Sequence, residues 1–226
     1  DFHAIRRHAY YFVAQEKGFY KEQGLNVNIV TSSGAADAIR KVAAGQAELG
    51  FADAGALIMA RANDNVQVKP LSIIYQKTPQ ALYAIEGNGI VQAKDLVGRK
   101  VADSGSSSNR LMFPAFAKAV GIDQEKVQFV VADGSALPAM LATGRADAIG
   151  QAIVGEPLLQ KVVAPKKLVR LAYKDQGLDY YGAGIVASDE FTGNDPETAR
   201  KFVAATLKGM QEAFGDPAAA GAILHR

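Results

Sequence analysis

Two stretches of the sequence decide the fold: VNIVTSSGAADAIRKVAAGQAELGF (residues 27–51) and VQFVVADGSALPAMLATGRADAIG (residues 127–150). Each has the pattern of a strand, a turn of small residues, a helix that stops at glycine, and a second strand that begins with Ala and an acidic residue. Many α/β proteins repeat strand–helix–strand units, but here the turn, the helix stop and the strand start match in the same order. The repeat therefore predicts two similar α/β lobes that face one another.

The rest of the chain alternates segments typical of strands and of helices, which favours an α/β fold throughout. We expect strands over 25–30, 47–51, 68–75, 100–103, 127–131, 146–150, 168–173 and 183–187. We expect helices over 8–23, 35–44, 54–62, 110–120, 134–144, 156–163 and 195–214, with a further helix cut short over 218–226. The segment 77–89 is expected to begin a crossover between the lobes.

The overlay of the two halves also predicts a difference between them. In the second half, the strand over 100–103 precedes a polar loop (105–109) and a helix. In the first half, the sequence begins at Asp1 already within the equivalent loop. We therefore expect the first strand of lobe one to lie upstream of Asp1.

Composition excludes several kinds of site. The net charge is +2 and the basic residues form no block, which argues against nucleic-acid binding. With no cysteine, and with His3, His8 and His225 too scattered for a ligand set, disulfides, thiolate chemistry and a metal site are not expected. Nucleophile-elbow and Walker-type motifs are absent from the sequence. We therefore predict neither an enzyme nor a bound cofactor.

Neither a membrane span nor an export signal is visible in the sequence. No apolar run reaches the roughly 20 residues that a bilayer-spanning helix needs. The residues present include no signal peptide, so we expect either a mature chain from which the signal was removed or a cytosolic protein.

Six turns at predicted strand–helix junctions are candidates for ligand contact, three in each half. Ligands of open α/β sheets bind beyond the carboxyl ends of strands, where helix N-termini present unpaired N–H groups. Ser and Asp at these places are also ordinary helix N-caps, so each turn has a purely structural alternative. The turns are residues 6–8, 32–34, 53–55, 106–109, 133–135 and 155–157.

Individual side chains in these turns differ in what they predict. Three serines in a row, Ser106–Ser108, exceed what a cap needs and favour a polar lining with room for a ligand. Asp53 and Glu156 would add negative charge beside anion-binding turns, so we expect an electrically mixed site. Glu156 could instead complement the helix dipole, His8 could be an ordinary helix residue, and Tyr181 an ordinary strand aromatic.

Four blocks, spread over nearly the whole chain, resemble one family. They are HAYYFVAQEKGFYKEQGLNVNIV (8–30), AAGQAELGFADAGAL (43–57), DLVGRKVADSGSSSNRLM (95–112) and GRADAIGQAIVGEPLL (144–159). Together they resemble the nitrate/sulfonate/taurine and thiamine-pyrimidine-precursor group of ABC-importer periplasmic solute-binding proteins.

The resemblance implies a type II periplasmic-binding-protein fold, in which two α/β lobes close about a hinge on a ligand in the cleft between them. Lobe one would comprise 1–78 plus 184–226, and lobe two 79–183. Since the chain has no Trp, Tyr10, Tyr75 or Tyr181 is expected to supply aromatic surface. The positions implied to face the ligand are His8, Ser33, Gly34, Asp53, Ala54, Ser106, Ser107, Ser108, Gly134 and Glu156.

The function implied is capture of a small polar organic solute (a sulfonate, carboxylate, amino-sulfonate or pyrimidine-like molecule) for an ABC transporter permease. The resemblance further implies a monomer that is periplasmic or lipid-anchored at the outer face of the cytoplasmic membrane.

Two other functions stay open at this point. One is an enzyme on the same fold, of the thiamine-pyrimidine or menaquinone-pathway type, although the former resembles a cysteine-bearing pattern and this chain has no cysteine. The other is the effector-binding domain of a transcription regulator. Upstream sequence would separate them, because import requires a signal peptide and regulation requires a DNA-binding helix pair.

Overall fold

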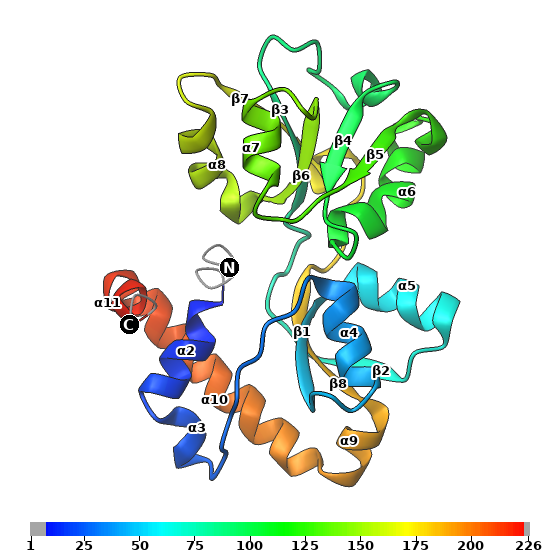
Figure 1. Cartoon of the computed structure of the whole chain (residues 1–226). Coiled ribbons are helices and arrows are strands. Elements are labelled where there is room, and N and C mark those ends of the chain that lie inside the picture. The colour runs from blue at the N-terminus through cyan, green and yellow to red at the C-terminus, as the bar shows by residue number, and fades with distance from the viewer. Residues whose placement is uncertain (1–7, 224–226) are drawn as a thin grey trace.

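Two separate β-sheets organise the chain, whose computed structural model describes residues 8–223. The smaller sheet has three strands in the order β1-β8-β2, and the larger has five in the order β5-β4-β6-β3-β7. Figure 1 shows the two sheets in separate lobes, each flanked by helices. The strands are β1 (Leu49–Asp53), β2 (Val68–Ile73), β3 (Gln80–Ile85), β4 (Lys100–Asp103), β5 (Gln128–Val131), β6 (Ala148–Ala152), β7 (Leu168–Ala172) and β8 (Ala183–Ser188).

Helices connect the strands in the alternating order that the sequence predicts. The α-helices are α2 (Ala9–Glu16), α3 (Phe19–Glu22), α4 (Ala35–Ala43), α5 (Ala54–Asp64), α6 (Ser108–Val120), α7 (Leu137–Ala142), α8 (Glu156–Val163), α9 (Asp189–Asn194), α10 (Pro196–Gly215) and α11 (Pro217–Ile223). Single 3₁₀ turns are η1 (Ala93–Leu96), η2 (Gln124–Lys126), η3 (Ile153–Gly155) and η4 (Tyr173–Gln176).

The two sheets share a pairing pattern, in keeping with the sequence repeat. In the larger sheet β3 runs antiparallel to both β6 and β7, and in the smaller sheet β8 runs antiparallel to both β1 and β2. β1 thus corresponds to β6, β8 to β3, and β2 to β7. The larger sheet adds β4 and β5, and β4 lies between β5 and β6 and runs parallel to both.

The chain crosses between the sheets twice, and the two crossing segments run side by side. The Tyr75 N–H donates to the Ala183 carbonyl (2.9 Å) and the Gly182 N–H donates to the Tyr75 carbonyl (2.8 Å). A Cβ on Gly182 would lie 2.8 Å from both the Lys77 carbonyl oxygen and the Tyr75 Cβ. Glycine is therefore required for this close approach. The crossings divide the chain after β2 and before β8; the predicted boundaries at 78/79 and 183/184 stay predictions.

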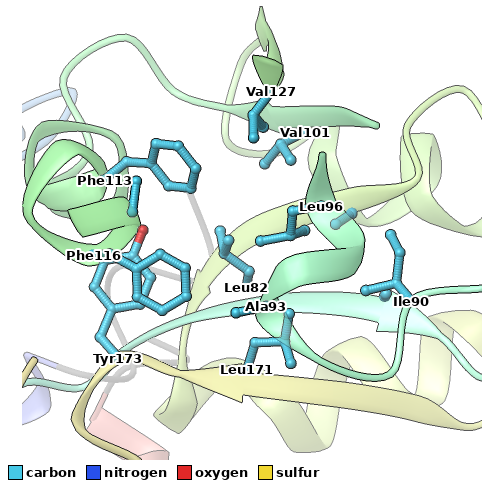
Figure 2. Close-up of a cluster of buried hydrophobic side chains, with 13 residues drawn as sticks. Leu82, Ile90, Ala93, Leu96, Val101, Phe113, Phe116, Val127, Leu171 and Tyr173 are labelled. Carbon is cyan, nitrogen blue, oxygen red and sulfur yellow. The ribbon is translucent and has the colours of Figure 1, made fainter. Parts of the chain in front are cut away.

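A large apolar cluster holds the five-stranded sheet to α6. Figure 2 shows Leu82 of β3 facing Phe116 of α6, with Tyr173 stacked on Phe116. The two rings are 4.2 Å apart at an interplanar angle of 18°. Each of these side chains is fully buried, and burial of one large apolar side chain contributes about 2 kcal/mol. The Tyr173 hydroxyl donates to the Asn109 carbonyl (2.9 Å), so its polar end is satisfied.

In the smaller lobe, α10 packs along α2, and the two helices approach closely at Gly209. A Cβ on Gly209 would lie 2.5 Å from the Tyr10 carbonyl oxygen and 2.6 Å from the Ala14 Cβ. Tyr20 of α3 stacks on Phe202 of α10 at 5.2 Å, and its hydroxyl shares a hydrogen bond with the Thr206 hydroxyl (2.9 Å).

Three predicted elements differ in the structure. The helix expected over 8–23 divides into α2 and α3, because Gly18 takes a left-handed conformation (φ 76°). The strand expected over 25–30 belongs to neither sheet; in lobe one, no described strand lies beside β1 where β4 lies beside β6. The helix expected from residue 134 begins at Leu137, since Asp133 holds Ser135 in a turn.

The segment 77–89 begins at the crossing between the lobes, as expected, but it also contains β3, which was not expected. Gln80 is 7 % exposed and the next four residues are completely buried. A strand buried on both faces lacks the alternation of polar and apolar residues that marks a half-exposed strand. Pro79, directly before it, also argued against a strand in the sequence.

We predict that Gly184→Ala destabilises the smaller lobe. Gly184 lies within the central strand β8, and a Cβ there would lie 1.9 Å from the Ser72 carbonyl oxygen. The new methyl group must push β2 away, which should cost about 2 kcal/mol or more. Urea unfolding measures the loss as a lower midpoint. Gly193→Ala in α9 is the control, because its Cβ would contact nothing within 4 Å; equal midpoints for the two variants would contradict this packing.

Candidate functional site

The turns before α4 and α6 touch each other and join the two lobes. The Ser106 hydroxyl donates to the Ser33 carbonyl (2.8 Å), and the two serine hydroxyls lie 3.2 Å apart. The Ala36 N–H donates weakly to the Ser106 carbonyl (3.4 Å). Two turns that the sequence predicts as ligand contacts thus come together in space, and they bind each other in this structure.

Gly34 permits this contact. Its φ is 146°, outside the range that other residues adopt comfortably, and a Cβ would lie 2.5 Å from the Ser106 carbonyl oxygen. Gly134, its counterpart in the sequence repeat, is exposed, and a Cβ there would contact nothing within 4 Å. The two glycines therefore differ in role, because only Gly34 lies against the other lobe.

Ser107 and Ser108 begin α6. The Ser107 hydroxyl accepts from the Arg110 N–H (3.1 Å), which is the ordinary N-cap bond that the structural alternative predicts. Ser108 is the first residue of the helix and is half-buried.

Asp53 ends β1 and caps α5 at the crossing between the lobes. One carboxylate oxygen accepts from the Ala56 N–H (3.2 Å), and the other accepts from the Gln80 side-chain amide of β3 (3.1 Å). The side chain is buried, and burial raises the pKa of this carboxyl above its usual range, while the hydrogen bonds from Gln80 and Ala56 oppose that rise. Ala54 is engaged as well, since its N–H donates to the Gly182 carbonyl (3.0 Å).

Asp103 lies at the end of β4 in lobe two, and the sequence analysis did not name it among the candidate ligand contacts. Its Oδ1 accepts from the Ser104 N–H (2.7 Å), and the side chain is 1 % exposed. A Cβ on Gly150 would lie 2.1 Å from its Oδ2, so glycine on the neighbouring strand makes room for the carboxylate. The signal in the sequence was an Asp at the end of the predicted strand 100–103.

Three buried polar atoms around the start of α6 have no hydrogen-bond partner within the described residues. They are Asp103 Oδ2, Asn109 Oδ1 and Arg110 Nη1. Folded proteins satisfy most buried polar groups, and each unsatisfied one costs about 1–3 kcal/mol. Two acceptors and one donor thus gather where α6 begins, beside the turn that contacts lobe one. This cluster is the strongest candidate for solute recognition.

The other predicted ligand contacts interact with residues outside this cluster. Glu156, in the first turn of α8, accepts from the Tyr83 hydroxyl (2.9 Å) and the Arg170 guanidinium (2.7 Å), both within lobe two. This carboxylate raises the pKa of Arg170. Tyr181 is 61 % exposed. His8 packs edge-on against Phe51 of β1 at 4.6 Å.

Metal binding and membrane spanning have no support in the described part of the chain. Residues 8–223 hold no group of three or more potential metal-ligating side chains of the His, Cys, Asp and Glu types. Within the same residues, no helix is both long enough and apolar enough to cross a bilayer. Arg6, Arg7, His3 and His225, considered in the sequence, lie outside the described residues.

We predict that Gly34→Ala loosens the contact between the lobes. The added methyl group would clash with the Ser106 carbonyl, so the Ala36 N–H should lose its bond across the lobes and exchange at least tenfold faster with solvent deuterium. Gly134→Ala, at the repeat-equivalent position, should leave exchange at Ala36 unchanged. Equal exchange rates in both variants would mean that the contact does not hold the lobes together.

We also predict a pH dependence that comes from Asp103. Burial raises the pKa of this carboxyl to about 6. The folded state then binds the proton more tightly than the unfolded chain, so stability falls as pH rises from about 4 to about 6 and stays lower above that. Asp103→Asn should remove this slope and raise the free energy of unfolding at pH 7.5 by about 2–3 kcal/mol.

Urea unfolding at several pH values tests the assignment. Asp133→Asn is the control. Hydrogen bonds from Ser135 lower the pKa of that exposed carboxyl, so its contribution to stability rises with pH, whereas that of Asp103 falls. An Asp103→Asn variant with the same slope as the parent between pH 4 and 6 would contradict the raised pKa.

Sequence comparison finds relatives with two kinds of name. The formylaminopyrimidine-binding protein of Halalkalibacterium halodurans is 27% identical over 220 residues, which cover 96% of this chain and 66% of that protein. The 4-amino-5-hydroxymethyl-2-methylpyrimidine phosphate synthase THI13 of Saccharomyces cerevisiae is 25% identical over 217 residues, covering 91% of this chain and 63% of that protein. The chain thus spans slightly less than two thirds of the length of these two relatives.

Solved structures confirm the predicted fold. The alkanesulfonate-binding protein SsuA from Xanthomonas axonopodis pv. citri, bound to MOPS, matches with a TM-score of 0.77 at 13% identity, covering 96% of this chain and 74% of that one. A Candida albicans gene product described as having the generic periplasmic binding protein structural fold matches with a TM-score of 0.71 at 17% identity, over 95% of this chain and 71% of that one. At these identities the likeness concerns the fold alone.

The two-lobed architecture and the resemblance in sequence thus agree. The family described as NMT1/THI5 like matches residues 6–220, which is nearly the whole chain. The chain therefore belongs to the NMT1/THI5-like family and has the periplasmic-binding-protein fold.

Proposed function

We propose that this chain captures a small polar organic solute at the junction of its lobes and delivers it to the permease of an ABC importer. It would act as a monomer in the periplasm, or lipid-anchored at the outer face of the cytoplasmic membrane. The two-lobed fold with paired crossing segments supports this role, since hinge closure on a ligand is how such lobes trap solutes. The name of the Halalkalibacterium relative, a binding protein, points the same way.

The observation that carries the proposal is the cluster of unpartnered atoms at the start of α6. Asp103 Oδ2 and Asn109 Oδ1 need donors, and Arg110 Nη1 needs an acceptor. A solute that offers both N–H groups and an acceptor atom would supply the partners that these atoms lack. Such a solute would remove the free-energy cost of leaving these buried polar atoms unpaired.

The electrostatics favour an amino-substituted nitrogen heterocycle over a sulfonate. Asp53 and Asp103 are both almost completely buried, at the ends of β1 and β4. An anionic group placed beside buried carboxylates would meet like charge in a low-dielectric setting, which is costly. An aminopyrimidine presents N–H donors and ring-nitrogen acceptors together, which matches the mixed polarity of the cluster.

The contact between Ser33 and Ser106 would work as a latch between the lobes. Its hydrogen bonds join hydroxyl and carbonyl groups at exposed or half-buried positions, so breaking them exchanges protein partners for water at little net cost. Opening about the paired segments at Tyr75 and Gly182 would uncover the start of α6. Closure would then bury the solute against Asp103.

Catalysis is the alternative that one relative's name raises, because that yeast protein is called a pyrimidine phosphate synthase. The chain supplies no cysteine, and its described residues hold no metal-ligating group of three. We propose binding without turnover. Prolonged incubation of the purified chain, followed by mass spectrometry, should yield no 4-amino-5-hydroxymethyl-2-methylpyrimidine phosphate; formation of this compound would favour the enzyme.

We predict that the chain binds the aminopyrimidine 4-amino-5-hydroxymethyl-2-methylpyrimidine in calorimetry and binds MOPS or taurine at least tenfold more weakly. Asp103→Asn should weaken aminopyrimidine binding at least tenfold, because the acceptor loses its charge and gains donor hydrogens. Asp133→Asn, which changes an exposed Asp in another turn, should bind like the parent. Tighter binding of the sulfonate, or full affinity in Asp103→Asn, would contradict the proposed recognition.

A further inference from the structure

A buried hydrogen bond between Asp53 and Gln80 joins the two lobes beside the paired crossing segments. Asp53 ends β1 of lobe one, Gln80 begins β3 of lobe two, and the Gln80 side-chain amide donates to Asp53 Oδ2 over 3.1 Å. The two residues are 2 % and 7 % exposed. A polar contact that lies between lobes and is also buried can influence how the lobes move.

Each of the two residues is held by the sheet of its own lobe. Asp53 pairs with Ala183 of β8 in the smaller sheet. Gln80 pairs with Ala152 of β6 in the larger sheet. Since neither backbone is free to follow the other lobe, a change in the angle between the lobes must alter the distance between the two side chains. Their hydrogen bond therefore restrains that angle.

Both oxygens of the Asp53 carboxylate have partners within the protein. Oδ1 accepts from the Ala56 N–H in the first turn of α5 (3.2 Å), which fixes the orientation of the side chain, and Oδ2 accepts from Gln80. Tyr180 of the second crossing segment lies near the same carboxylate, because burial and then the charge of Asp53 raise the pKa of its hydroxyl. Residues of α5, of β3 and of the second crossing segment thus meet at one side chain.

Close packing surrounds this bond. A Cβ on Gly55 would lie 2.7 Å from the Met112 sulfur of α6 and 2.8 Å from Tyr180 Cε2, so only glycine lets these side chains approach α5 beside the carboxylate. A hydrogen bond to a charged acceptor is stronger in such a water-poor setting than at the surface. The contact between Ser33 and Ser106 lies at exposed or half-buried positions. Of these two polar contacts between the lobes, the buried one is therefore the stronger restraint.

We propose that Asp53 is a positioning residue, which holds the lobes in their closed arrangement through Gln80 and does not itself contact the solute. This inference rests on the proposed function, since the closed arrangement is the one that would retain a solute. Asp103 and its neighbours would recognise the solute, while the bond between Asp53 and Gln80 would set how readily the lobes separate and release it.

The test compares two changes at this contact. Gln80→Met removes the donor and keeps the length of the side chain. The double variant Asp53→Asn with Gln80→Glu exchanges donor and acceptor, so that the new amide at position 53 donates to the new carboxylate at position 80 while its oxygen still caps α5. Hydrogen–deuterium exchange of the Ala36 amide, whose bond crosses to Ser106, is measured without solute. Calorimetry then measures binding of 4-amino-5-hydroxymethyl-2-methylpyrimidine.

In Gln80→Met, we expect Ala36 to exchange at least tenfold faster and the aminopyrimidine to bind at least fivefold more weakly. In the double variant, both quantities should stay within about twofold of the parent, because the hydrogen bond is restored with reversed polarity. Gln128→Met, at an exposed position of β5, is the control for the substitution itself. Leu141→Ala, in the core of lobe two, is the control for lost stability alone. Neither control should change exchange at Ala36.

Parental exchange at Ala36 in Gln80→Met would overturn the proposal, because the bond would then not hold the lobes. Equal acceleration in Leu141→Ala would overturn it as well, since lost stability would explain the effect. A double variant with parental exchange but lost binding would assign Asp53 to solute contact instead. If the parent binds no aminopyrimidine, the proposed solute is wrong, whereas exchange at Ala36 still decides whether Asp53 holds the lobes.

Discussion

The pairing of the two crossing segments is the constraint on which the rest of the structure depends. Gly182 and Tyr75 approach so closely that a side chain at 182 has no space. Each segment leads directly into an interior strand of a sheet, β3 in lobe two and β8 in lobe one. Backbone hydrogen bonds thus hold the two crossing segments together, while the Lys77–Asp179 ion pair (3.2 Å) lies at the surface and contributes little.

From that constraint follows the placement of two buried carboxylates. Asp53 ends β1 and accepts from the Ala56 N–H in the first turn of α5, whereas Asp103 ends β4 and accepts from the Ser104 N–H in the loop before α6. Burial still raises both pKa values, which means that the ionised forms are held at a cost in stability. Residues that lower the stability of the fold are expected at a binding site, because selection there acts on ligand binding and not on folding.

Structural features that depend on the local residue pattern could be predicted from the sequence. Features that depend on contacts between residues distant in the chain could not. The doubled strand–turn–helix unit predicted the two lobes, and α8 was predicted with its observed bounds. β3 was missed because its burial on both faces removes the alternation that identifies strands. Among the predicted ligand contacts, Ser33, Gly34 and Ser106 do meet, and their role in binding a solute stays a prediction. Asn109 and Arg110 have unpartnered atoms only because of how α6 packs. No residue pattern reports such packing.

The same limit explains the strand expected over 25–30. Its side-chain period is that of a strand, but a strand exists only when its backbone groups have partners. Side-chain donors from Gln15 and Lys41 are a weaker substitute, because each satisfies one carbonyl and neither continues along the segment.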